Sequence, residues 1–130
     1  GAANFSGTAR YTTTFELPSP LPASCRLDLG RVANTARIFL NGEPLGISWS
    51  TPHVVDLTKS LKPGENLLEI EVTNLAANRI ADLDRRKVPW KAFHEINFVN
   101  IDYKLFDASA WHAMDSGLLG PVRLLVTAKP

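Results

Sequence analysis

The residues best able to do chemistry in this chain are its acids, histidines and tryptophans. Hydrolysis of a glycosidic bond needs two carboxyl groups that flank the bond. The acids nearest to such a use are Glu95, which follows His94, and Asp102. Thirteen Asp and Glu residues make some suggestive pair inevitable, so surface carboxylates are the favoured interpretation. The sequence lacks a Gly-rich phosphate loop, a His-Glu-x-x-His motif and a Gly-x-Ser-x-Gly motif, and we predict no catalytic residue in it.

Metal binding finds little support in the residue pattern. The three histidines, His53, His94 and His112, do not have the spacing of metal ligands. A structural calcium ion held by loop carbonyls and by Asp82 or Asp84 would leave little trace in a sequence. We therefore expect no cofactor, with structural calcium as the alternative.

Three tryptophans lie in or beside segments that we expect to be loops. A tryptophan on a loop offers a flat apolar face to a sugar ring, while its N–H stays hydrated. For Trp49, between two apolar strands, we favour a plug at the end of the fold over a sugar platform. For Trp90 and Trp111 the two interpretations are equal. If the chain binds sugar, we expect the contact at Trp90 or Trp111, with polar help from residues 78–84.

Composition narrows the class of protein. The 130 residues, 45% hydrophobic and 21% charged, are enough for one soluble domain with a core. A net charge of +1 gives no electrostatic reason to expect nucleic acid or an anionic membrane as partner. We interpret the run 85–87, Arg-Arg-Lys, as a solvated loop, because acids precede it. Cys25 is the only cysteine, which excludes an internal disulfide, and its alternation with Leu27 predicts a buried, inert position.

Alternating apolar residues predict a series of short strands. Turn chemistry separates them, and no long helical period is present, which indicates an all-β fold: an antiparallel β-sandwich of the jelly-roll kind. We expect Thr58 to Leu61 to form one helical turn and residues 75–95 and 107–120 to be long irregular loops. The strands are expected at residues 8–17, 25–29, 38–47 as a hairpin, 53–57, 66–73, 96–106 and 121–127.

The hairpin carries the strongest local signal. Asn41-Gly42 suits the two positive-φ positions of a tight I′ turn. We expect this turn to set Ile38 and Leu40 against Leu45 and Ile47.

The order of these motifs resembles a known family. Five segments resemble the sugar-binding, galactose-binding-like β-sandwich domain of family 2 glycoside hydrolases. They are residues 15–18, 27–32, 38–42, 56–58 and 61–66. Residues 72–74, 78–80 and 82, and the terminal segment 116–122, resemble the C-terminal β-sandwich of family 106 α-L-rhamnosidases. Together they cover nearly the whole chain.

The resemblance implies an accessory module. In such enzymes the catalytic acids usually lie in a separate barrel, so we expect residues 1–130 to be one β-sandwich domain excised from a larger, secreted or periplasmic bacterial glycoside hydrolase. The implied partners are carbohydrate, with plant polysaccharide as the candidate, and the parent's catalytic domain. The first alternative is a purely structural domain that packs against the parent's catalytic domain without binding sugar. The second alternative is a free-standing hydrolase. For Asn78, Arg79 and Asp82 we favour a buried structural network over a sugar subsite.

Overall fold

The computed structural model describes residues 3–92 and 99–128. Its internal contacts divide the chain into two compact units. The sandwich unit comprises Gly7–Asn74 and Asp115–Pro130, and the helical unit comprises Gly1–Ser6 and Leu75–Met114. Within the described part of the chain, no helix is both long enough and apolar enough to span a membrane.

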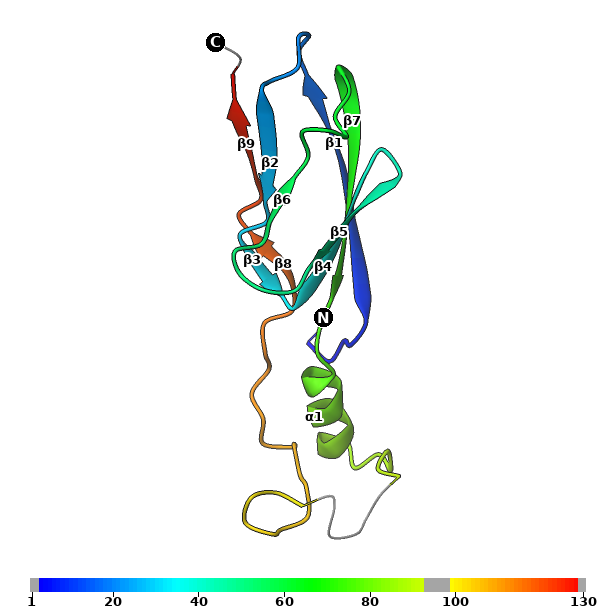
Figure 1. Ribbon diagram of the computed structural model, residues 1–130. Helices are drawn as coiled ribbons and strands as arrows, with labels where there is room; N and C mark the ends of the chain where they lie inside the picture. Colours follow the sequence, from blue (N-terminus) through cyan, green and yellow to red (C-terminus); the bar gives the residue numbers. More distant parts are fainter. Residues whose placement is uncertain (1–2, 93–98, 129–130) are drawn as a thin grey trace. The chain divides into compact units, whose positions relative to one another are not determined.

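The sandwich unit is built from antiparallel strands, which confirms the predicted fold class. The strands are β1 (Thr8–Leu17), β2 (Ser24–Asp28), β3 (Arg31–Ala33), β4 (Thr35–Leu40), β5 (Glu43–Ser48), β6 (Val54–Asp56), β7 (Gly64–Thr73), β8 (Gly117–Gly120) and β9 (Arg123–Thr127). One sheet has the order β1-β7-β4-β5 and the other the order β6-β2-β9, and β3 and β8 form a separate pair (Figure 1).

The core of this unit follows the predicted alternation. On β7, Leu68, Ile70 and Val72 are buried, and Glu71 on the opposite face pairs with Arg10 of β1. Cys25 is fully buried in the same core, as expected, and burial raises the pKa of its thiol, which disfavours the reactive thiolate. Each buried aliphatic side chain contributes about 1.5–3 kcal/mol.

The hairpin turn is confirmed, but the register beyond it is not as predicted. Asn41 and Gly42 have φ angles of 53° and 85°, the positive pair that a I′ turn needs. A β-bulge then falls between Ile38 and Phe39, so that Ile38 pairs with Gly46 instead of Leu45. The bulge shifts the remaining pairs by one residue and places Ile47 opposite Arg37. The Ile47 side chain is 63% exposed there.

Two further expectations for this unit need correction. Residues 58–60 form a hydrogen-bonded turn and not a helical turn, with the Thr58 amide donating to the Asp56 carboxylate at 2.8 Å. The short strands β3 and β8 were not predicted. They meet where a Cβ on Gly30 would lie 2.5 Å from the carbonyl carbon of Gly120, so the close approach requires glycine.

The helical unit contains α1 (Ala77–Arg85), within the segment expected to be irregular. The prediction of a strand at 96–106 is wrong for its described part, residues 99–106, which fold into a turn closed by a bridge between Val99 and Leu105. The side chain of Asn100 accepts hydrogen bonds from the amides of Asp102 and Lys104 at 2.9 and 3.0 Å. This asparagine turn interrupts the apolar alternation.

Candidate functional site

The site begins at the C-terminal end of α1. The Lys87 amide donates to the Asp84 carbonyl at 3.0 Å, and the Val88 amide donates to the Leu83 carbonyl at 2.9 Å. This is the Schellman pattern, whose first residue past the helix adopts the left-handed conformation. Lys87 is that residue, with φ at 56°. The chain therefore turns sharply after α1, and the Trp90 and Lys91 side chains contact Asp84 in the last helical turn.

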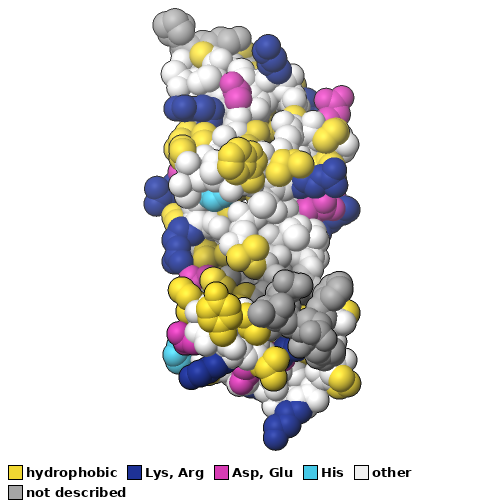
Figure 2. All heavy atoms as spheres, turned by 60° about the horizontal axis from the view of Figure 1, so that its bottom comes forward, with side chains coloured by type: hydrophobic (Ala, Val, Ile, Leu, Met, Phe, Trp, Pro, Cys, Tyr) yellow, Lys and Arg dark blue, Asp and Glu magenta, His cyan; other side chains and the backbone are white. Residues whose placement is uncertain are grey.

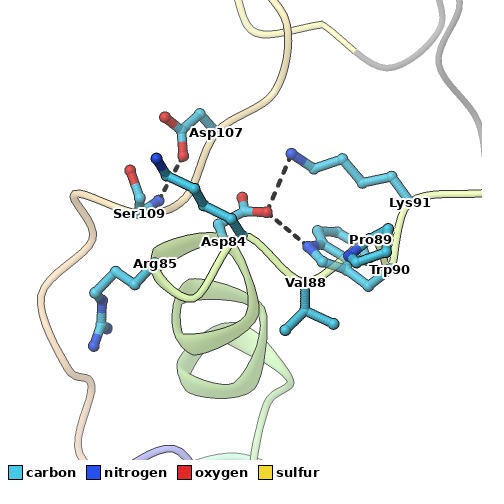
Figure 3. A pocket seen from close by; sticks show the side chains of 9 residues that line it. Asp84, Arg85, Val88, Pro89, Trp90, Lys91, Asp107 and Ser109 are labelled. Carbon is cyan, nitrogen blue, oxygen red and sulfur yellow. Dashed lines mark hydrogen bonds and ion pairs between the residues drawn. The ribbon is translucent and has the colours of Figure 1, made fainter.

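Asp84 is the centre of the site. Its Oδ1 accepts hydrogen bonds from the Trp90 indole N–H at 2.7 Å and from the Lys91 ammonium at 3.1 Å. Its Oδ2 accepts from the backbone amide of Ala108 at 2.8 Å. Figure 3 shows the Trp90 and Lys91 side chains converging on this carboxylate, which is only 6% exposed. One side chain thus holds the helix, the loop after it and the segment at 108 together.

The carboxylate of Asp84 stays ionised. Burial alone would raise its pKa, but the hydrogen bonds from Ala108, Trp90 and Lys91 outweigh burial and hold the pKa below its ordinary value. Lys91 is satisfied in turn, because its ammonium also donates to the Phe106 carbonyl at 2.7 Å. The buried charge of Asp84 is therefore paired with that of Lys91.

An aromatic cluster surrounds this ion pair. Trp90 and Phe106 pack edge to face with centroids 6.2 Å apart, and Phe106 meets Trp111 in the same way at 5.6 Å. The Lys91 ammonium lies 5.5 Å from the Trp90 ring centroid. Such contacts fix the orientation of the Trp90 ring. Trp111, at the edge of the cluster, is 46% exposed.

A hollow of about 690 Å³ opens beside Trp90, a volume within the range of small-molecule sites. The Asp107 carboxylate accepts a hydrogen bond from the Ser109 amide at 2.8 Å (Figure 3). The backbone and side chain of Ser109 lower the pKa of Asp107, so it is ionised at neutral pH. The hollow is lined by Asp84, Arg85, Lys87, Val88, Pro89, Trp90, Lys91, Asp107 and Ser109.

The other candidates on α1 lie outside the hollow and do not form one network. Asn78 is buried and exchanges two hydrogen bonds with the backbone of Met114, at 2.9 and 2.8 Å. Arg79 and Arg86 both contact the Asp82 carboxylate, at 3.4 and 2.8 Å. Burial opposes ionisation of Asp82, but these arginines lower its pKa overall. Asn78 therefore anchors the segment at 114, and Arg79 belongs to a separate surface ion pair.

The three tryptophans have different surroundings, although Trp90 and Trp111 both pack on Phe106. Trp90 lines the hollow, Trp111 packs on Phe106 outside its lining, and Trp49 belongs to the sandwich unit. Trp49 is 75% exposed, so the expectation that it plugs the end of the sandwich is wrong. Trp49 directly follows strand β5. The bulge shifts the register of that strand, so that the nearby Ile47 pairs with Arg37 and is exposed.

The acids considered for catalysis and for calcium have other surroundings. His94 and Glu95 lie outside the described residues, and Asp102 is exposed on the asparagine turn. Among residues 3–92 and 99–128, no three His, Cys, Asp or Glu side chains gather as metal ligands do. Asp84 faces three N–H donors, which does not suit cation binding.

Sequence reasoning missed the parts of the hollow contributed by Lys87, Lys91, Asp107 and Ser109. It considered Asp84 for calcium and, within residues 78–84, for polar contacts to a sugar, but not as the anchor of the site. A signal for the helix was present: Arg79, Asp82 and Arg86 have the i,i+3 and i,i+4 spacing of charge pairs on one helical face. Recognising a helix that ends near Arg86 would have put Asp84 in its last turn.

Comparison with known proteins gives the family. Residues 5–105 match the model of the family described as "Glycosyl hydrolase 2 galactose-binding domain-like". The chain belongs to this family. The galactose-binding-like domain is 37% identical over 145 aligned positions to the protein of Formosa agariphila named "Putative beta-glucuronidase". That match covers 97% of this chain and 12% of the relative.

Two solved structures extend the comparison. The rhamnosidase from Novosphingobium sp. PP1Y is 33% identical, with a TM-score of 0.74 over 93% of this domain and 11% of that enzyme. The unmatched part is much smaller than the helical unit, so this likeness includes most of that unit. The β-glucuronidase of Bifidobacterium dentium is 32% identical, with a TM-score of 0.51 over 55% of this domain and 12% of that enzyme. The domain spans about a tenth of each relative.

Proposed function

We propose that this chain is a non-catalytic module of a larger bacterial glycoside hydrolase, and that it contacts carbohydrate and helps to position it. The family membership, and relatives named as rhamnosidase and β-glucuronidase, support a place in such an enzyme. The short span of the match supports a separate catalytic region. Plant polysaccharide remains the candidate for the carbohydrate.

The observation that carries the proposal is the hollow beside Trp90. Asp84 and Phe106 hold the indole in one orientation, so a sugar ring would stack on it at little cost in side-chain entropy. Asp107 and Ser109 also line the hollow and supply polar groups for hydrogen bonds with hydroxyl groups. A rigid aromatic face with polar groups beside it is a common carbohydrate-binding arrangement.

The expected affinity is weak. One sugar ring stacked on one aromatic side chain leaves little surplus after the cost of association, so we expect a dissociation constant of about 1 mM, or about −4 kcal/mol. Weak binding suits a module that is covalently linked to an enzyme, because linkage raises the effective concentration of the site.

Titration with plant-polysaccharide oligosaccharides, followed by tryptophan fluorescence, tests the proposal. Trp90→Ala should abolish the response, and Trp111→Ala should reduce it less, because only Trp90 lines the hollow. Trp49→Ala is the matched control in the sandwich unit and should leave the affinity unchanged. Circular dichroism establishes that each variant is folded. Loss of binding in the Trp49 variant alone, or no binding by the wild type, would contradict the proposal.

A second candidate function is packing against the parent's catalytic domain without sugar binding. The exposure of Trp49, 75%, and of Ile47, 63%, favours it, because exposed large apolar side chains close in sequence are typical of contact surfaces. Trp49→Ser should then lower the unfolding temperature of the full-length parent and leave that of this chain alone unchanged. Equal effects on both proteins would refute this alternative.

The proposed parent enzyme is an exported protein. The full-length reading frame should encode a catalytic barrel and an N-terminal export signal. A reading frame with neither would contradict it.

A further inference from the structure

The hollow beside Trp90 carries an excess of positive charge. Its wall holds three cations, Arg85, Lys87 and Lys91, and two acids, Asp84 and Asp107. Lys91 and Asp84 neutralise each other at 3.1 Å. Within the residues that the structure describes, Arg85 and Lys87 make no ion pair. Among the described lining residues, two cations are therefore left without an ion-pair partner, against one remaining carboxylate, that of Asp107.

Lys87 occupies a position that its backbone does not favour. The first residue past a Schellman helix end is in the left-handed region, where a side chain is strained and glycine is the usual choice. Lys87 has φ at 56° there. Helix-end charge does not account for a lysine, because Arg85 and Arg86 already place cations at this end. Non-glycine residues held in this region cluster at active sites and ligand-binding sites.

On these two observations we propose that the hollow binds an acidic sugar, and that Lys87 is the residue which contacts its anionic group. The inference rests on the proposed carbohydrate contact and names its chemical class: a sugar that carries a carboxylate or a sulfate. Stacking on Trp90 would provide affinity for any ring, whereas the cation would select the charged one. Arg85, which also lines the hollow, adds to the positive potential without being required for the contact.

The test compares trigalacturonate with its fully methyl-esterified form, which has the same sugar rings but carries methyl esters in place of the charged carboxylates. Binding of each to the 130-residue chain is measured by calorimetry at low and at high salt. The variant Lys87→Gly removes the cation and relieves the strained backbone, and Lys87→Arg keeps the charge. Tyr103→Gly is the matched control, because Tyr103 is also left-handed, with φ at 57°, and lies outside the hollow. A sulfated galactose trimer forms the third arm.

The wild type should prefer trigalacturonate or the sulfated trimer over the ester, and the arm with the higher affinity identifies the anion. Lys87→Gly should lower that preference about twofold to fivefold, as expected for an exposed ion pair, and 0.5 M salt should have a similar effect on the wild type. The same variant should unfold at a temperature no lower than the wild type, because glycine suits the position. Lys87→Arg and Tyr103→Gly should keep the preference.

The failures of the two proposals are distinguishable. Equal binding of the charged ligands and the ester, or a preference that survives Lys87→Gly, would overturn the role of Lys87 and leave the carbohydrate contact standing. Absence of binding by all three ligands and by neutral oligosaccharides would overturn both.

Discussion

Replacing Asp84 with alanine should destabilise the helical unit more than replacing any other carboxylate residue described in that unit. The substitution leaves three donors without their acceptor: the Trp90 indole, the Ala108 amide and the Lys91 ammonium. An unsatisfied buried donor costs about 1–3 kcal/mol. Lys91 counts for less, because it is 24% exposed and still reaches the Phe106 carbonyl. The expected loss is about 3–5 kcal/mol. Asp84→Asn, which keeps one acceptor, should lose about half as much.

The loss should depend on pH with a definite sign. The pKa of Asp84 is lowered in the folded protein, so its ionised form stabilises the fold above its unfolded pKa, which is about 3.9. That contribution disappears as the pH falls through the folded pKa. The difference in stability between the wild type and Asp84→Asn should therefore be constant near pH 7 and shrink below about pH 4.

Urea unfolding in a Trp49→Phe background measures the effect, because the remaining tryptophans, Trp90 and Trp111, both lie in the helical unit. Asp102→Ala, on the exposed turn of the same unit, is the control and should be within about 0.5 kcal/mol of the wild type. An unchanged midpoint for Asp84→Ala, or a difference for Asp84→Asn that grows on acidification, would refute the assignment of Asp84 as the charged anchor of the site.

Three further outcomes are expected. Gly42→Val should lower the unfolding free energy by about 1–3 kcal/mol, because φ is 85° there, and an unchanged thermal midpoint would contradict the I′ turn. Asn66→Ala should cost about 2–4 kcal/mol in urea unfolding, since its fully buried amide bonds Asn41, Lys62 and Gly64; a loss below 1 kcal/mol would contradict this. The chain alone should release no aryl product from a panel of aryl glycosides that includes rhamnosides. Sustained release abolished by Asp102→Ala would contradict the non-catalytic proposal.

The sheets were predictable where local pattern and burial agree. On β7, every second residue from Leu68 to Val72 is apolar, and the sheet buries just that face. The turn at Asn41-Gly42 was predictable because few other residue pairs tolerate two positive φ angles. The bulge opposite Ile38 was not, because an inserted residue changes which face a side chain takes without changing the apolar pattern.

The helical unit was less predictable, for two physical reasons. Helix α1 begins at Ala77 without a side-chain cap, so its usual start signal is missing. Residues 99–105 alternate like a strand, but Asn100 closes a turn and leaves Ile101 94% exposed. The site could not be predicted for the same reasons. It is formed by the end of α1 and by backbone amides such as that of Ala108, which have no sequence signature.

The face in Figure 2 shows apolar groups interrupted by charges of both signs, in line with the absence of a polyanion signal in the composition.

The most direct test of the central claim is a two-dimensional ¹⁵N NMR titration of the chain with plant-polysaccharide oligosaccharides. The account predicts fast-exchange shifts in the Trp90 indole signal and in the amides of residues 84–91 and 107–109, saturating with a dissociation constant of about 1 mM. Residues of the sandwich unit, Trp49 included, should not shift. Shifts confined to the sandwich unit, or none at ligand concentrations of about 10 mM, would contradict the assignment of the carbohydrate contact to the hollow beside Trp90.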